Sequence, residues 1–238
     1  MERTPDSVFK YPMKAAIDNA QRISYMDTCM RFGWKEVGYS PGHGGVMQVV
    51  CYGPSLKKTW EKIDPALPII TVSGARGFLV ERGIVPKYHA DMDPREHKLR
   101  FLRNPHPRTT YLMASCCHPM SWALLCGLDV RIFHVWNGHQ IERWCDIKGQ
   151  RQAMIYTGSH VGGCAIRLAQ RMGYRKFIVH GMDMSFETDA THAGGHGGPV
   201  HKQEVEFVND VPFITSKISV NMADEMLHWL KTDPIDAT

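Results

Sequence analysis

The fold is decided by the stretch Val46-Met47-Gln48-Val49-Val50-Cys51-Tyr52-Gly53-Pro54-Ser55-Leu56-Lys57-Lys58. Its first half is an apolar, β-branched run of strand length, and the Gly-Pro-Ser turn that follows suits the start of a helix. Such a turn aims backbone N–H groups and the positive end of a helix dipole at one point in space. The stretch therefore predicts either an anion site or an ordinary connection between a strand and a helix.

The same alternation of strand and helix continues along the chain. Before the alternating region, we expect a covering helix over residues 13–32. After it, we expect a hairpin with its turn at Asn209-Asp210 and a closing helix over residues 222–230. The predicted strands cover residues 46–51, 67–73, 88–91, 109–114, 130–135 and 176–181. The predicted helices between them cover residues 56–63, 75–82, 96–102, 120–125 and 161–172.

Strict alternation of this kind is typical of an α/β fold with a doubly wound, mainly parallel sheet that carries helices on both faces. We expect residues 1–45 to form a helical cover and connector and residues 46–238 to form one domain. Residues 137–156 show no regular pattern.

The composition of the chain bears on its binding partners and on its location in the cell. The 238 residues carry 28 basic and 24 acidic side chains, a formal charge of +4 that is spread along the chain, so nucleic acid is not expected. Seven cysteines without C-x-x-C spacing indicate reduced thiols. The N-terminus lacks a secretory signal and no apolar run is long enough to span a membrane, so we expect a cytoplasmic protein.

Candidate ligand-binding residues follow the predicted strands, because ligands of open parallel sheets bind outside the carboxyl ends of the strands. Glycines and carboxylates together at this edge indicate a phosphate and a hard cation such as Mg²⁺. The candidates at the strand ends are Gly53, Pro54, Ser55, Ser73, Gly74, Asp91, Asp93 and Asp183. Asp93 lies nearer the edge and is the preferred catalytic residue, to bind a metal ion or a substrate hydroxyl, whereas Asp91 either joins it at the metal or holds the turn.

Two further segments could carry chemistry. Gly158 and Ser159 open a helix and predict a second backbone anion site, since neither a G-x-S-x-G elbow nor a Walker-type phosphate loop is present. The Gly- and His-rich segment 191–198 predicts a mobile lid on which His192 acts as a general base or binds phosphate. A zinc site formed by His192, His196 and His201, and a plain surface loop, are the alternatives.

Together, several motifs resemble the 6-hydroxymethylpterin diphosphokinase-like family, which includes the motility accessory factors that glycosylate bacterial flagellin. The resemblance extends over roughly residues 46–230, in the order in which the motifs occur in the family. It rests on residues 49–56, on Gly83-Ile84-Val85-Pro86-Lys87-Tyr88 with Asp93, on Gly158-Ser159-His160-Val161, on Gly173-Tyr174 with Gly181-Met182-Asp183, and on Asp210-Val211-Pro212-Phe213-Ile214-Thr215.

The resemblance implies a Rossmann-like fold similar to that of CMP-sialic acid sialyltransferases. It also implies that Gly53 and Ser55 contact nucleotide phosphate or ribose, that Asp93 belongs to the nucleotide or metal site, and that Ser159 and Asp183 line the same cleft. The chain differs from the sialyltransferase pattern at Tyr52, where those enzymes carry Asn.

Three functions are consistent with these features. The first, which we favour, is Mg²⁺-dependent transfer of diphosphate from ATP to a hydroxymethylpterin-like alcohol. The second is sugar transfer from a nucleotide donor to a glycan or other acceptor, with His192 as general base. The third is a nucleotide-binding module without turnover. The sequence also allows a homo-oligomer.

Overall fold

The centre of the molecule is a parallel β-sheet. The computed structural model describes residues 8–12, 15–186, 192–193, 204–232 and 236–237. Within this part of the chain nine strands form the sheet, in the order β1-β6-β5-β4-β3-β2-β8-β11 with β7 beside β6, and every pair is parallel. The strands are β1 (Lys35–Glu36), β2 (Val46–Val50), β3 (Ile69–Val72), β4 (Tyr88–Asp91), β5 (Thr110–Ala114), β6 (Val130–Val135), β7 (Met154–Ile155), β8 (Lys176–His180) and β11 (Asp236–Ala237).

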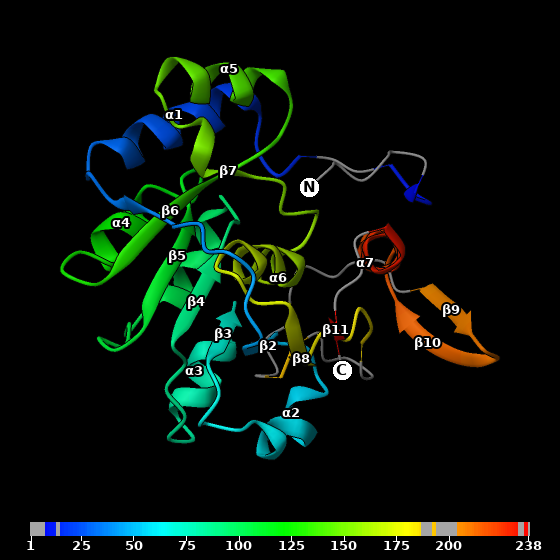
Figure 1. Cartoon of the computed structure of the whole chain (residues 1–238). Helices are drawn as coiled ribbons and strands as arrows, with labels where there is room; N and C mark the ends of the chain where they lie inside the picture. Colours follow the sequence, from blue (N-terminus) through cyan, green and yellow to red (C-terminus); the bar gives the residue numbers. More distant parts are fainter. Residues whose placement is uncertain (1–7, 13–14, 187–191, 194–203, 233–235, 238) are drawn as a thin grey trace.

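Helical segments connect these strands (Figure 1). They are α1 (Asn19–Met30), α2 (Leu56–Thr59), η2 (Trp60–Lys62), α3 (Ala75–Val80), η3 (Glu96–Leu102), α4 (Met120–Leu124), α5 (His139–Ile147), η4 (Arg151–Ala153), α6 (Val161–Arg171) and α7 (Lys217–Thr232). A separate antiparallel hairpin is formed by β9 (Glu204–Val208) and β10 (Val211–Thr215). The predicted Rossmann-like, doubly wound α/β fold is confirmed.

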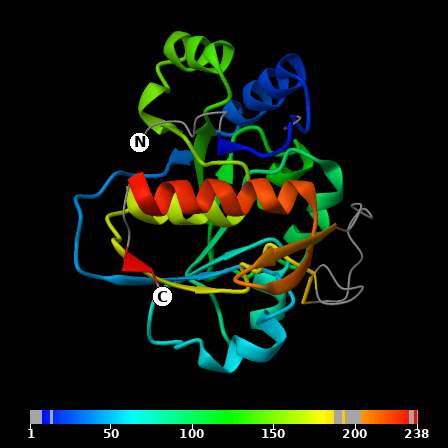
Figure 2. The same ribbon diagram turned by 90° about the vertical axis from the view of Figure 1, so that its right-hand side faces the viewer.

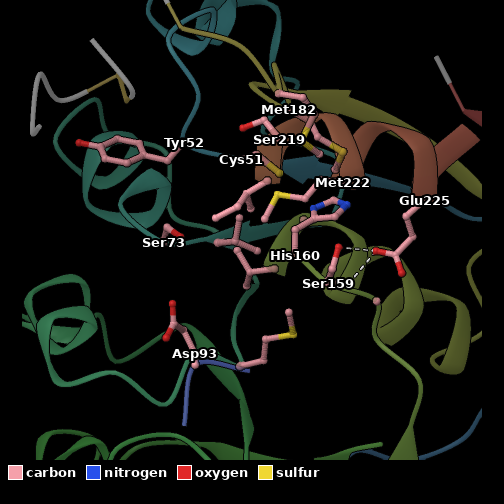
Figure 3. Close-up of a pocket in the computed structure, with 18 of the residues that line it drawn as sticks. Cys51, Tyr52, Ser73, Asp93, Ser159, His160, Met182, Ser219, Met222 and Glu225 are labelled. Carbon is pink, nitrogen blue, oxygen red and sulfur yellow. Dashed lines mark hydrogen bonds between the residues drawn. The ribbon is translucent and has the colours of Figure 1, made fainter. Parts of the chain in front are cut away.

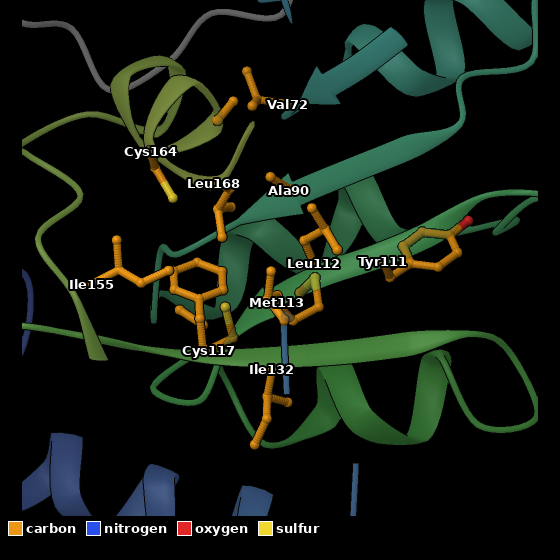
Figure 4. Packing of buried hydrophobic residues seen from close by; sticks show 14 of the residues in the cluster. Val72, Ala90, Tyr111, Leu112, Met113, Cys117, Ile132, Ile155, Cys164 and Leu168 are labelled. Atoms are coloured by element: carbon orange, nitrogen blue, oxygen red, sulfur yellow. The ribbon is translucent and has the colours of Figure 1, made fainter. Parts of the chain in front are cut away.

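Alternation along β2 shows that both faces of the sheet are buried. Val49 belongs to an apolar cluster with Leu168 of α6, whereas the next residue, Val50, belongs to a second cluster with Leu56 of α2 and Phe78 of α3. Successive side chains of a strand point to opposite faces, so α6 covers one face while α2 and α3 cover the other. Figure 4 shows the larger cluster, in which Leu168 packs among side chains of β3, β4 and β5.

The path of the chain fixes where a ligand can bind. From β2 the strands are added outward in sequence to β6, and α6 then returns the chain to β8, on the other side of β2. The strand order therefore reverses between β2 and β8. In open α/β sheets the crevice outside the carboxyl ends of such a strand pair is the usual ligand site.

Several predicted boundaries differ from the structure. The first helix begins at Asn19 because the Asp18 carboxylate accepts a hydrogen bond from the Gln21 N–H at 2.8 Å, which caps the helix there. Residues 137–156, which showed no pattern, contain α5, η4 and β7. The predicted hairpin turn is confirmed, since Asn209 and Asp210 both adopt positive φ, at 49° and 61°.

Helix α7 runs alongside α6, and the β9–β10 hairpin extends beyond its N-terminal end (Figure 2). The N-terminal segment reaches this helix, because the Asn221 side chain exchanges hydrogen bonds of 3.0 and 2.7 Å with the backbone N–H and carbonyl of Tyr11. Within the described ranges, no helix combines the length and apolar character needed to cross a membrane.

Candidate functional site

A large open cleft lies at the carboxyl edge of the sheet. Its volume is about 1410 Å³, and it is lined by the segments that follow β2, β3, β4 and β8, by the start of α6 and by α7. Figure 3 shows Tyr52, Ser73 and Asp93 on one side of the cleft, with Ser159 and Glu225 on the other. The strand-end rule therefore located the cleft correctly.

The turn after β2 and the turn after β8 are joined by hydrogen bonds. The Ser55 N–H donates to Asp183 Oδ2 at 2.7 Å, the Ser55 hydroxyl bonds the other Asp183 oxygen, and the Gly53 N–H donates to the Gly181 carbonyl at 2.8 Å. A Cβ on Gly53 would lie 2.5 Å from both Asp183 Oδ2 and the Gly181 carbonyl oxygen. This close approach explains the glycine.

The Asp183 carboxylate therefore occupies the position at the Ser55 N–H where an anion was predicted. Gly53 and Asp183 line the cleft, whereas Pro54 and Ser55 are not among its lining residues. A phosphate that bonded the Ser55 N–H would have to displace Asp183. Phosphate binding by Gly53, Pro54, Ser55 and Asp183 stays a prediction.

Beside this turn, Ser73 and Gly74 follow β3. Ser73 adopts a positive φ of 49° and lines the cleft. Gly74 is not a lining residue, and a Cβ there would lie 2.1 Å from the Tyr52 ring. The glycine makes room for Tyr52, whose ring stacks on His192 with centroids 5.6 Å apart and an 18° angle between the planes.

His192 lines the cleft beside Tyr52, in agreement with the predicted position of its loop over the strand ends. The Ala193 N–H anchors it by donating to the Tyr52 carbonyl at 3.0 Å. The rest of the Gly- and His-rich segment, with His196 and His201, lies outside the described residues, and so does the zinc alternative that depended on them. General-base action by His192 stays a prediction.

The start of α6 holds a second carboxylate. Ser159 donates to Glu225 Oε2 through its N–H at 2.7 Å and through its hydroxyl at 2.6 Å, and the Tyr156 hydroxyl donates to Glu225 Oε1 at 2.9 Å. Glu225 is fully buried. Gly158, at φ +75°, is packed so closely that a Cβ would lie 2.3 Å from Trp229. The Ser159 N–H is thus bonded by the protein's own Glu225, and binding of a ligand anion or nucleotide by Gly158 and Ser159 stays a prediction.

Glu225 was not among the predicted site residues. The available signal was its spacing, since Asn221, Glu225 and Trp229 recur every four residues and are the three buried side chains of α7. Two polar groups on the buried stripe of a helix require partners inside the protein. Such a stripe could have marked this helix as part of the site.

His160 is the N-cap of α6 and also lines the cleft. Its Nδ1 accepts a hydrogen bond from the Gly163 N–H at 3.1 Å, whereas its Nε2 is buried without a hydrogen-bond partner among the described residues. Burial lowers the pKa of His160 to about 4, so the ring is neutral at physiological pH.

The two aspartates after β4 have different environments. Asp91 is buried, and its Oδ1 accepts a hydrogen bond from the Asp93 N–H at 3.0 Å. It therefore holds the turn, which is one of the two roles predicted for it. Burial raises the pKa of Asp91 to about 6. Burial alone would also raise the pKa of Asp93, but the hydrogen bonds from Arg95 and the charge of Lys98 hold it below its usual value.

These contacts bear on the predicted metal site. Both carboxylate oxygens of Asp93 accept from the Arg95 guanidinium, at 2.8 and 2.5 Å, and Lys98 Nζ lies 3.5 Å away. In the part of the chain that the structure describes, no group of three or more His, Cys, Asp or Glu side chains could hold a metal ion. A Mg²⁺ ion that arrives with phosphates needs only one or two carboxylates, and Asp91 and Asp93 both line the cleft. Their role as metal ligands stays a prediction.

A row of basic side chains on η3 and just before it was also missed. Arg95, His97, Lys98 and Arg100 all line the cleft on the side of Asp93. Basic side chains that converge on a cleft attract and bind phosphate. Their dense spacing after Asp93-Pro94 was visible in the sequence.

The fold and the cleft define a doubly wound α/β protein with a large cleft at the switch point of the sheet. The model of the family described as 6-hydroxymethylpterin diphosphokinase MptE-like matches residues 45–189, more than half of the chain. The chain belongs to this family. The matched residues contain the strands from β2 to β8 and the segments after them, and membership indicates a transferase.

Among solved structures, the MAf glycosyltransferase from Magnetospirillum magneticum AMB-1 has a similar fold, with a TM-score of 0.69 at 15% sequence identity. The similarity covers 94% of this chain and 37% of that protein, so this chain corresponds to little more than a third of it. No individual curated protein sequence matches the chain.

Proposed function

We propose that the chain transfers diphosphate from ATP to the hydroxyl group of a hydroxymethylpterin-like alcohol, with Mg²⁺. The observation that carries this proposal is the position of the cleft, which lies at the switch point and is lined largely by residues within the family match. Its volume of about 1410 Å³ exceeds the range of about 300–1,000 Å³ typical of small-molecule sites, so two substrates fit together.

In this reaction the acceptor oxygen attacks the β-phosphorus of ATP. The bond between that phosphorus and the oxygen that bridges to the α-phosphate breaks, AMP leaves, and the hydroxyl proton passes to a base. The basic side chains around η3 can neutralise charge on the transferred phosphates, while the walls of the cleft hold both substrates in line. A bound Mg²⁺ would supply further charge neutralisation between phosphate oxygens, with Asp91 and Asp93 as its protein ligands.

Sugar transfer from a nucleotide donor is the second candidate, and the placement of His192 favours it. Its imidazole lines the cleft and is half-buried against Tyr52. An imidazole in this position can take up the proton of the hydroxyl group of the acceptor substrate. The oxygen of that hydroxyl attacks the anomeric carbon of the donor sugar, and the nucleotide leaves. The solved structure with a similar fold is that of a glycosyltransferase, which is consistent with this candidate.

A product assay distinguishes the candidates. The protein is incubated with Mg²⁺, ATP and 6-hydroxymethylpterin, and in parallel with CMP-sialic acid and lactose. Phosphorus NMR follows the nucleotides and the diphosphate monoester, and mass spectrometry detects sialylated lactose. We expect AMP and a diphosphate monoester to form in equal amounts in the first mixture. Release of CMP with formation of a sialylated sugar in the second mixture alone would instead establish the glycosyltransferase. If nucleotide binds and neither product forms, the chain is a binding module and the proposed transfer is wrong.

A further inference from the structure

The guanidinium of Arg22 lies in the wall of the cleft. Arg22 is on α1, only 6% of its surface is exposed, and it lines the cleft. Its Nη1 donates to Cys116 Sγ at 3.6 Å, and its Nε has no hydrogen-bond partner in the described part of the chain. Among the described residues, no carboxylate lies within ion-pair distance of Arg22.

Cys116 does not neutralise this charge. A thiol sulfur is a weak hydrogen-bond acceptor, and burial raises the pKa of Cys116 despite the neighbouring cation, so the group stays a neutral thiol. Its sulfur is also within 3.7 Å of the Met92 carbonyl oxygen. A buried charge that lacks both a counter-ion and good acceptors destabilises a folded protein.

A second buried arginine shows what a structural role looks like here. Arg76 is 3% exposed and donates to the backbone carbonyls of Phe101, Arg103 and Asn104, each at 2.9 Å. Its guanidinium ties the end of η3 to α3 and needs no ligand. Arg22 has no such set of acceptors, which indicates that its partner is supplied from the cleft.

Arg22 lies at a different position along the edge of the sheet from the switch point. Cys116 follows β5 and Met92 follows β4, and from β2 to β5 there are three strand steps. Neighbouring strands lie about 4.8 Å apart, so about 14 Å separates the two positions along the edge of the sheet. A group bound near Arg22 is therefore distinct from one bound at the turn after β2.

We propose that Arg22 binds an anionic group, a carboxylate or a phosphate, on the second substrate of the cleft. Combined with the proposed function, on which this step rests, the acceptor is an alcohol that also carries an acidic group. Planar guanidinium binds both oxyanions through paired hydrogen bonds. Arg22 precedes the matched residues 45–189, so the anion site is a feature of this chain beyond the family match.

The test uses inorganic phosphate and acetate as probes, with sodium chloride at equal ionic strength as the reference. In wild-type protein we expect saturating phosphate or acetate to raise Tm by about 5 °C. The anion that gives the larger Arg22-dependent shift in Tm identifies the class of anion that binds. Arg22→Met removes the charge but keeps an extended side chain. It should abolish the acetate shift and reduce the phosphate shift to the part that the basic side chains around η3 contribute, with Tm in chloride unchanged or higher than that of wild type.

Arg31→Met is the matched control, because Arg31 is exposed at the C-terminal end of the same helix. It should leave the anion-induced shift intact. The proposal is overturned if Arg22→Met keeps the shift, or if Arg22→Met lowers Tm in chloride by several degrees, since the charge would then belong to the fold.

Repeating the titrations with saturating Mg²⁺ and ATP separates this proposal from the proposed function. The Arg22-dependent shift should persist with nucleotide bound, and Arg22→Met should bind ATP as wild type does. If wild type binds no nucleotide but keeps the Arg22-dependent shift, the proposed function fails and the anion site stands. If ATP binds and no shift depends on Arg22, the anion site fails alone.

Discussion

At the scale of single residues, carboxylates of the protein occupy both backbone positions that the sequence marked for anions. Asp183 bonds the Ser55 N–H after β2, and Glu225 bonds the Ser159 N–H before α6. Ser55 is the N-cap of α2, and Ser159 directly precedes His160, the N-cap of α6. The two carboxylates therefore link the segment after β8 and helix α7 to the segments that begin these helices.

Substitution of Glu225 measures one of these links. Glu225→Ala leaves the N–H and hydroxyl of Ser159 and the hydroxyl of Tyr156 without their acceptor, so we expect the free energy of unfolding to fall by about 3 kcal/mol. Glu225→Gln keeps one oxygen and should lose about 1 kcal/mol. Urea denaturation of both variants, with Asp224→Ala as the control on the same helix, provides the measurement. Equal losses in Glu225→Ala and Asp224→Ala would contradict this role.

At the scale of elements, the sequence predicted most of the sheet. Apolar, β-branched runs such as that at β2 identify central strands because both faces of a parallel sheet are buried. The two-residue strands β1 and β7 gave no such signal. Helix α5 was missed because it has only nine residues, of which three are buried, too few to establish a helical period.

The site was predictable only where it depends on strand ends. The positions of Gly53, Ser73, Asp91, Asp93 and Asp183 follow from the topology alone. The contacts of Glu225 and Arg22 depend on how α7 and α1 pack against the cleft. The spacing of Asn221, Glu225 and Trp229 indicates a buried polar face of α7, but it does not show which residues that face contacts. The same holds for the pairing of Ser55 with Asp183, which joins segments 128 residues apart.

At the scale of the whole molecule, buried neutral histidines make the fold sensitive to acid. Burial lowers the pKa of His89 to about 3 and that of His160 to about 4, and it also lowers the pKa of His134. In the unfolded chain these imidazoles take up protons near pH 6.5, while the folded protein excludes them. The contribution of these histidines to stability should therefore be complete above about pH 6.5 and decrease as the pH falls below it.

One histidine in this group contributes about 2 kcal/mol of that loss by pH 5, since a difference of one pH unit corresponds to about 1.4 kcal/mol. We expect His89→Gln to show a correspondingly smaller loss between pH 7.5 and pH 5, measured by urea denaturation at both values. His139, whose side chain is 98% exposed, provides the control variant His139→Gln. A pH dependence unchanged by His89→Gln would contradict the assignment.

The central claim, that the cleft at the switch point is a nucleotide site, is tested most directly by calorimetric titration of ATP with and without Mg²⁺. We predict that wild-type protein binds ATP more tightly with Mg²⁺ than without it. Asp93→Asn should lose this Mg²⁺-dependent gain with a nearly unchanged urea midpoint, since Asn keeps an oxygen that can accept the hydrogen bonds from the Arg95 N–H and Nε. If neither ATP nor CMP binds wild-type protein under any of these conditions, the cleft is not a nucleotide site.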